Sequence, residues 1–228
     1  MRWAEGTTIL TGLVGSQAYG LAHGNSDNDY LSVHVAPIED ILGLKNWAVQ
    51  DKSIVTTDPD HTSHEIGKFC RLAIKGNPTV NELMWLSSYH YCDKNGQALV
   101  CYRKHFLSRH TYLAYRGYIK GQIHKLTLQD GTPTPRFPKA SKHVMRLVFQ
   151  LIHLVTEGNI QVALELQAIE TIQEMMHGKD FSPEGIELWA NREMAKMDDY
   201  TFHPLLSRPE PDTEVISDML VDIRKQME

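Results

Sequence analysis

Residues 15–35 read GSQAYGLAHGNSDNDYLSVHV and directly follow the apolar segment TILTGLV of residues 8–14. That segment is rich in β-branched residues and stops at a Gly-Ser pair, which predicts a buried strand leading into a turn. Apolar and polar residues alternate over residues 29–35, which predicts a second, half-buried strand. A short helix is expected between the two strands, over residues 17–22. The chain therefore opens as a small α/β unit.

Two carboxylates stand where the second strand begins, at Asp27 and Asp29. Residues two apart in a strand point to the same face, so these side chains are expected to lie side by side. Adjacent carboxylates repel each other, and one takes up a proton unless a cation neutralises the pair. Hard oxygen ligands of this kind suit Mg²⁺ or Mn²⁺. Gly15 and Ser16 offer backbone N–H groups and a hydroxyl to phosphate oxygens, so the combination predicts phosphoryl or nucleotidyl transfer.

The rest of the chain is predicted to be mainly helical, after one more strand at residues 53–57. The predicted helices span residues 66–74, 78–86, 98–106, 111–126, 139–157, 159–177, 182–197 and 214–227. Three prolines and a glycine mark residues 129–138 as a linker. This order predicts an α+β fold, with a small mixed sheet flanked by helices over residues 1–130 and a helical bundle over residues 131–228.

The composition is that of a globular protein: 42% of the 228 residues are hydrophobic and 22% are charged. The apolar runs are too short to span a membrane. Cys70, Cys92 and Cys101 form no CxxC pair, so neither a disulfide framework nor a zinc knuckle is expected. The N-terminal sequence MRWAEGTT lacks an apolar leader, which favours a cytoplasmic protein; a phage-encoded protein acting in the host cytoplasm is one such case.

Positive charge is concentrated in the middle of the chain, although the formal net charge is −5. The net charge by segment is −4, +9 and −10 over residues 1–102, 103–146 and 147–228. In the basic segment, one predicted helix face carries residues spaced at i, i+3, i+4 and i+7, which are Lys139, Lys142, His143 and Arg146. We expect a nucleotide triphosphate at this face, with a solvated or acid-paired face as the alternative.

The pair Gly15-Ser16 followed by Ser26-Asp27-Asn28-Asp29 resembles the GS…DxD signature of the DNA polymerase β-like nucleotidyltransferase superfamily. Further motifs along about residues 8–200 are similar to predicted nucleotidyltransferases associated with RNA repair in bacteria and phages. These motifs are Tyr19-Gly20, Lys68-Phe69 with Leu72, Lys75-Gly76-Asn77-Pro78 with Glu82-Leu83, Tyr118 with Gly121-Gln122 and Lys125-Leu126, and Lys142-His143 with Arg146-Leu147. The resemblance is most specific in the first 90 residues.

The resemblance implies a helical domain that closes over a nucleotide, and two metal ions held by the DxD pair and a third acid on a neighbouring strand. By position, Asp27 and Asp29 are implied to be catalytic metal ligands, while Gly15 and Ser16 hold the β- and γ-phosphates. Mg²⁺ or Mn²⁺ is expected, with Co²⁺ as a further option. The third ligand is expected to be Glu65. Three more residues compete for that place: Asp58, Asp60 and His64.

These implications predict a metal-dependent nucleotidyltransferase that moves a nucleotidyl group from an NTP or dNTP to an acceptor. The acceptor is left open among an RNA end, a nucleotide and a protein hydroxyl, and no membrane partner is expected. A second hypothesis is a metal-dependent (deoxy)nucleoside 5′-monophosphate phosphohydrolase on the same fold, because a Glu as third ligand can signal a changed chemistry. A third hypothesis is a catalytically degenerate nucleotide- or RNA-binding module.

Overall fold

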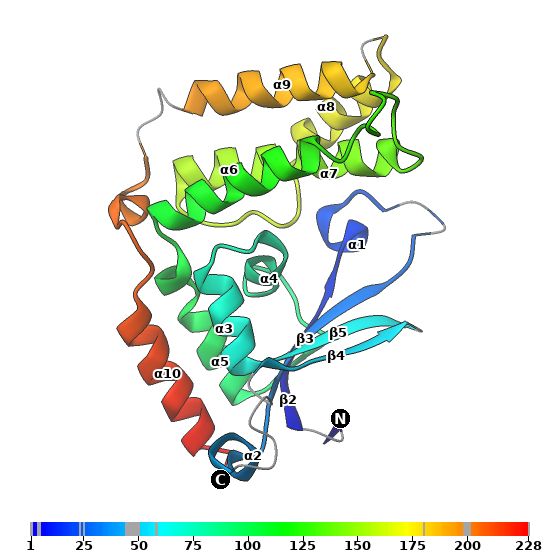
Figure 1. Ribbon diagram of the computed structural model, residues 1–228. Coiled ribbons are helices and arrows are strands. Elements are labelled where there is room, and N and C mark those ends of the chain that lie inside the picture. Colours follow the sequence, from blue (N-terminus) through cyan, green and yellow to red (C-terminus); the bar gives the residue numbers. More distant parts are fainter. Residues whose placement is uncertain are drawn as a thin grey trace.

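The computed structural model of the chain describes residues 2–3, 6–22, 24, 26–43, 51–57, 59–179, 181–197 and 202–227. Figure 1 shows a mixed sheet with helices packed against one face and a second group of helices lying across them. This arrangement confirms the predicted α+β class. In the described ranges, no helix combines the length and the apolar character that crossing a lipid bilayer requires.

Among the described residues, the sheet contains six strands. They run in the order β1-β2-β3-β5-β4, and β6 pairs beside β1 on the outer edge of β2. Their bounds are Arg2–Trp3 for β1, Gly6–Val14 for β2, Asp29–Val35 for β3, Ser53–Thr57 for β4, Asp60–Glu65 for β5 and Tyr91–Cys92 for β6. Only β3 and β5 are parallel, and every other pairing among these strands is antiparallel. The strands predicted at residues 8–14, 29–35 and 53–57 are confirmed.

Strand β5 is the longest of the described strands that the apolar pattern did not predict; the two-residue strands β1 and β6 are the others. Its sequence, DHTSHE, contains no apolar residue, yet it lies between β3 and β4. Polar side chains pair across the strands instead. The Nε2 of His61 lies 2.6 Å from the Oγ of Ser32, and the Oγ of Ser63 lies 2.8 Å from the Nδ1 of His34. Side-chain hydrogen bonds therefore satisfy the buried polar groups of this strand. A search for alternating apolar residues does not detect a strand of this kind.

Helices near the sheet have the bounds Ser16–Tyr19 for α1, Ile38–Leu42 for α2, Ile66–Ile74 for α3, Pro78–Leu83 for α4, Lys94–Cys101 for α5 and Thr213–Lys225 for α10. Helices of the second group are α6 (Arg109–Ile123), α7 (Phe137–Glu157), α8 (Leu166–His177) and α9 (Pro183–Lys196). Short 3₁₀ turns, η2 and η4, span Arg103–Phe106 and Pro204–Ser207.

Two helices begin four or more residues from the predicted start, α5 and α8. Helix α5 starts at Lys94, because the Asp93 side chain accepts hydrogen bonds from two backbone N–H groups and caps the helix. Helix α8 starts at residue 166, not at 159 as expected. The segment before it buries Ile160, Val162 and Leu164 at alternate positions, which is the period of extended chain. Its end also reaches α1, where the N–H of Leu164 donates to the carbonyl of Tyr19.

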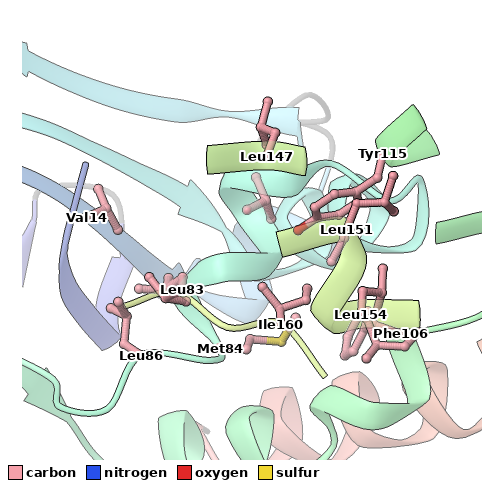
Figure 2. Close-up of a cluster of buried hydrophobic side chains, with 14 of the residues drawn as sticks. Val14, Leu83, Met84, Leu86, Phe106, Tyr115, Leu147, Leu151, Leu154 and Ile160 are labelled. Carbon is pink, nitrogen blue, oxygen red and sulfur yellow. The ribbon is translucent and has the colours of Figure 1, made fainter. Parts of the chain in front are cut away.

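One hydrophobic cluster joins the sheet to both groups of helices. Figure 2 shows Leu83 and Met84, from the end of α4, in the same cluster as Leu147, Leu151 and Leu154 from α7. These side chains are fully buried or nearly so. The core therefore holds α7 against the end of α4, and that contact positions the cavity described below.

The division at residue 130 stays a prediction, and the packing crosses it in both directions. Helix α6, which precedes residue 130, packs against α7 and α9. Helix α10, at the C-terminal end, packs back against α3 and α5, as Figure 1 also shows. The last helix thus stabilises the sheet side of the molecule rather than the second group of helices.

Candidate functional site

Three aspartates stand at neighbouring strand starts. Asp29 opens β3 and Asp60 opens β5. The parallel register pairs Tyr30 with His61, so the residues one position earlier, Asp29 and Asp60, occupy adjacent rows. Asp27 lies two residues before Asp29 and is exposed. The third acid next to the DxD pair is therefore Asp60, which competes with Glu65 for that place in the sequence.

The electrostatics of Asp29 reflect this grouping. Partial burial raises the pKa of the Asp29 carboxyl above its usual range, and the carboxylates of Asp60 and Asp27 raise it further. The ammonium group of Lys139 acts in the opposite direction and lowers the pKa of Asp29. Ionising all three aspartates is thus unfavourable without a cation. Lys139 of α7 is close enough to stabilise the ionised form of Asp29 electrostatically.

Gly15 fits against Asp29 in a way that no other residue can. Val14 pairs with Asp29 across β2 and β3, so Gly15 follows directly beside the carboxylate. A Cβ on Gly15 would lie 2.3 Å from the Oδ2 of Asp29, and the backbone of Gly15 has a φ of +73°. Both observations require glycine here. The missing side chain keeps the backbone open next to the carboxylates.

A cavity of about 550 Å³ opens between these strand ends and helix α7. From the sheet side it is lined by Gly15, Ser16, Tyr19, Leu21, Ser26, Asp27 and Asp29, and from α7 by Pro138, Lys139, Lys142, His143 and Arg146. Figure 1 shows α1 lying under the α7 layer, which is where these two sets meet. Every site residue expected from the sequence lines this cavity except Glu65.

Arg146 lines the cavity, but its guanidinium is bound by side chains of the protein core. It is 1% exposed and forms an ion pair with Glu82 of α4, which is fully buried. Its Nη1 also donates to the Oε1 of Gln150 at 2.9 Å, and its guanidinium lies 3.8 Å from the ring centroid of Tyr19. Most of its donors are therefore committed to the protein, and the expectation that Arg146 serves a nucleotide stays a prediction.

His143 takes its protonation state from Arg146. The Nη2 of Arg146 donates to the Nδ1 of His143 at 3.0 Å, so the ring proton belongs on Nε2. Burial, together with the charges of Arg146, Lys125 and Lys139, lowers the pKa of His143 to about 3. The imidazole is neutral at physiological pH and offers one N–H donor, so only Lys139 and Lys142 bring positive charge to the α7 side of the cavity from exposed or half-buried positions.

Sequence reasoning gave no role to Tyr19 and Glu82, although both stand in the motifs that it singled out. The Tyr19 hydroxyl donates to the Oε2 of Glu82 at 2.7 Å. Burial, reinforced by the Glu82 carboxylate, raises the pKa of Tyr19 well above its usual value, so the phenol stays protonated. Glu82 thereby joins α1 to α7, since it binds Tyr19 on one oxygen and Arg146 on the other.

The structure corrects the expectation for Glu65 as a catalytic metal ligand. Glu65 closes β5, at the opposite end of that strand from Asp60. Its carboxylate is fully buried, accepts a hydrogen bond from the N–H of Gly67 at 2.6 Å and pairs with the Nη2 of Arg224 at 2.9 Å. Glu65 caps α3 and anchors α10. His64, which also competes for the third ligand position, bonds to Ser53 and lines none of this cavity, and Asp58 lies outside the described residues.

We predict that Glu65→Gln lowers the free energy of unfolding by about 2 kcal/mol, because a charged hydrogen-bond acceptor of Arg224 is lost. Urea unfolding measures the loss. Affinity for Mn²⁺, followed by isothermal titration, should stay unchanged. If Glu65→Gln lost as much metal affinity as Asp60→Asn, Glu65 would be a metal ligand after all.

The donors near Asp29 suit a hard divalent cation. They are carboxylate oxygens, they raise one another's proton affinity, and they lie beside a cavity that Gly15 keeps open. Among the described residues, no three Asp, Glu, His or Cys side chains already form a closed metal-binding group. Asp27, Asp29 and Asp60 are therefore candidates by position and chemistry.

A known protein family matches most of this chain. Residues 3–199 match the model of a family described as RlaP, RNA repair pathway DNA polymerase beta family. A search of curated proteins found no match. The family match includes the strands and helices that form the cavity, and it supports a nucleotidyltransferase-type enzyme with a nucleotide substrate. The chain belongs to the RNA repair pathway DNA polymerase beta family.

Proposed function

We propose that the protein transfers a nucleotidyl group from a nucleoside triphosphate to an acceptor hydroxyl, with divalent metal held by Asp27, Asp29 and Asp60. One observation carries the proposal: a single cavity joins two of these carboxylates to Gly15-Ser16 and to the lysines of α7. Carboxylates that gather metal, next to lysines that meet phosphate, are the apparatus of nucleotidyl transfer.

Each residue at the cavity has a role that follows from its chemistry. Ser16 and the open backbone at Gly15 offer hydrogen-bond donors to the β- and γ-phosphates. Lys139 and Lys142 neutralise phosphate charge. His143 supplies one neutral N–H donor from Nε2. Mg²⁺ or Mn²⁺, when bound, withdraws charge from the phosphates and lowers the pKa of the acceptor hydroxyl.

The proposed reaction is an in-line displacement. The acceptor oxygen attacks the α-phosphorus, and a new P–O bond forms while the bond to the β-phosphate oxygen breaks. Pyrophosphate leaves with the electron pair of that bond, and the hydroxyl proton passes toward the carboxylate group. Lys139 and Lys142, which line the cavity, stabilise the charge of the leaving pyrophosphate in this proposal.

The test uses α-³²P-labelled nucleoside triphosphates, Mg²⁺ or Mn²⁺, and a panel of acceptors that includes RNA ends, mononucleotides and the protein itself. We expect label transfer with equal release of pyrophosphate, both abolished by EDTA. Transfer at equal rates in wild type and in an Asp27→Ala, Asp29→Ala double variant contradicts the proposal. Metal-dependent nucleotide binding without any turnover favours the degenerate binding module instead.

The phosphohydrolase hypothesis loses its main support. It depended on a Glu in the third ligand position, whereas Glu65 caps α3 and Asp60 stands beside Asp29. The labelled assay still distinguishes it, since a phosphohydrolase releases inorganic phosphate from nucleoside monophosphates.

The α7 lysines should act on nucleotide affinity. We predict that Lys139→Ala raises KM for the nucleoside triphosphate about tenfold, because one charge-assisted phosphate contact is lost. The matched control is Lys225→Ala, which removes another exposed lysine, from the last turn of α10. Equal KM values for the two variants would show that the α7 lysines do not meet the phosphates.

A further inference from the structure

A second cavity, of about 370 Å³, lies on the reverse face of the same sheet end. It is lined by Thr8, Thr11, Tyr30, Pro59, His61, His90 and Tyr91. Tyr30 directly follows Asp29, and His61 directly follows Asp60. Since successive strand residues point to opposite faces, the rings of this cavity stand back to back with the carboxylates. Consecutive Cα atoms are about 3.8 Å apart, so only the thickness of one strand layer separates the two sites.

The walls of this cavity are rings set at an angle to one another. Tyr30 meets His61 edge-on, with ring centroids 6.1 Å apart, and meets His90 in the same manner at 5.6 Å. The rings are thus not stacked on each other. His90 is exposed, and Tyr91 is 43% exposed. Exposed aromatic and histidine rings are the surfaces on which unpaired bases stack.

The lining is polar but carries no permanent charge. No Lys, Arg, Asp or Glu is among the described residues that line it. The Nε2 of His61 already lies 2.6 Å from the Oγ of Ser32. A phosphate therefore finds no counter-charge here, whereas a neutral planar ring finds faces and hydroxyls.

The buried hydroxyl of Thr8, which lines the second cavity, favours a ligand there. Thr8 is 4% exposed, and in the described part of the chain its Oγ1 has no hydrogen-bond partner. The neighbouring Thr11 is satisfied, since its hydroxyl lies 2.7 Å from the Oγ of Ser32. An unsatisfied buried hydroxyl costs free energy unless a ligand or water completes it. The edge of a heteroaromatic ring carries both donors and acceptors that can do so.

We propose that this second cavity binds an unpaired nucleobase of the acceptor, which is a single-stranded nucleic acid, while the acceptor's terminal hydroxyl lies at the carboxylates. The inference rests on the proposed function. The acceptor strand would cross the edge of the sheet formed by the starts of β3 and β5. Its base would lie on the face with the second cavity, and its terminal hydroxyl on the face with the carboxylates. The acidic net charge of the chain is compatible with this, because stacking rather than bulk charge holds the acceptor.

The test measures binding of a fluorescein-labelled five-nucleotide single-stranded RNA by anisotropy, with its DNA counterpart as a second probe, in the absence of nucleoside triphosphate. We expect His90→Ala to weaken binding about tenfold, in the range of one stacked base. His90→Phe, which keeps a ring, should restore most of the affinity. His110→Ala serves as the control, because His110 is a half-exposed histidine of α6 that pairs with Glu210 instead.

A probe that lacks its terminal bases completes the test. The abasic probe should bind weakly and should no longer distinguish wild type from His90→Ala. Equal affinity of wild type and His90→Ala for the full probe, equal loss in His90→Ala and His90→Phe, or no measurable binding by wild type would each overturn the proposal. Nucleotide binding with Mg²⁺ is titrated separately. If probe binding depends on the ring at position 90 but no label is transferred, the result contradicts the proposed activity and still supports base binding in the second cavity.

Discussion

Asp29→Asn should reduce kcat for nucleotidyl transfer by about 1,000-fold, because a lost metal ligand removes about 4 kcal/mol of transition-state stabilisation. The measurement is the labelled transfer assay at saturating nucleotide. Asp130→Asn is the matched control, since Asp130 is an exposed aspartate in the loop before α7 whose partners are within that loop. Retention of turnover in Asp29→Asn would remove this carboxylate from the reaction.

The same substitution should stabilise the metal-free protein. The folded-state pKa of Asp29 is raised by burial and by the carboxylates of Asp60 and Asp27. A carboxyl with a raised pKa binds protons more tightly in the folded state than in the unfolded one, so its ionisation makes stability fall as pH rises through the two values. At pH 7, Asp29→Asn should therefore have a higher free energy of unfolding than wild type, with a flatter dependence on acidic pH.

Metal should reverse that order. Mn²⁺ neutralises the carboxylate group in wild type, so millimolar Mn²⁺ should raise the Tm of wild type and leave that of Asp29→Asn nearly unchanged. Scanning calorimetry with and without EDTA measures both. A Tm of wild type that does not respond to Mg²⁺ or Mn²⁺ contradicts metal binding at the aspartates, independently of any acceptor.

Much of the cavity could be anticipated because its residues lie in local patterns. The Gly-Ser pair and the DxD pair are set by a strand, a turn and a strand, and the period of two fixes which face they share. The α7 residues follow the helical period. The structure brings these two sets to one cavity. Their chemical roles stay predictions that the assays above address.

The third acid could not be found in this way, because it depends on strand pairing. Asp60 and Glu65 bracket one strand with no apolar residue, and the hydrophobic pattern does not show where that strand begins or ends. Only the parallel register with β3 places Asp60 beside Asp29 and sends Glu65 to the far end. A five-residue difference along the chain thus separates a candidate metal ligand from a helix cap.

Arg146 shows the other limit. Its helical spacing correctly puts it on one face with Lys139 and His143, and the face does border the cavity. Periodicity does not reveal how deep each turn of α7 is buried. The core contacts of α7 bring Arg146 over Glu82 and the ring of Tyr19, while Lys139 stays exposed near the start of the helix.

The Glu82–Arg146 pair is expected to be among the costliest contacts to break. Glu82→Gln should lower the free energy of unfolding by about 4 kcal/mol, because it leaves a buried guanidinium without its counter-charge. Arg146→Met should cost a similar amount. The double variant should cost less than the sum, by about 2 kcal/mol, since neither charge is then left alone. The exposed pair of Lys196 and Glu193 is the control: Lys196→Met should cost less than about 0.5 kcal/mol.

The pH dependence of His143 protonation shows whether the Glu82–Arg146 pair is purely structural or whether Arg146 also positions His143. In wild type the pKa of His143 is about 3, so its imidazole resonances should not titrate between pH 5 and 8. Arg146→Met removes the Nη2 donor to Nδ1 and one nearby positive charge, so the pKa of His143 should rise, although burial still holds it below 6.5.

Stability should follow the same titration. The unfolded chain takes up a proton at His143 near pH 6.5, whereas the folded wild type does so only near pH 3. The unfolded state therefore binds more protons between these values, and wild-type stability falls as pH drops from 6.5 toward 3. Arg146→Met should fall less steeply across this window. Identical slopes, together with a His143 that titrates near 6.5 in wild type, would show that Arg146 does not set the protonation state of this cavity-lining histidine.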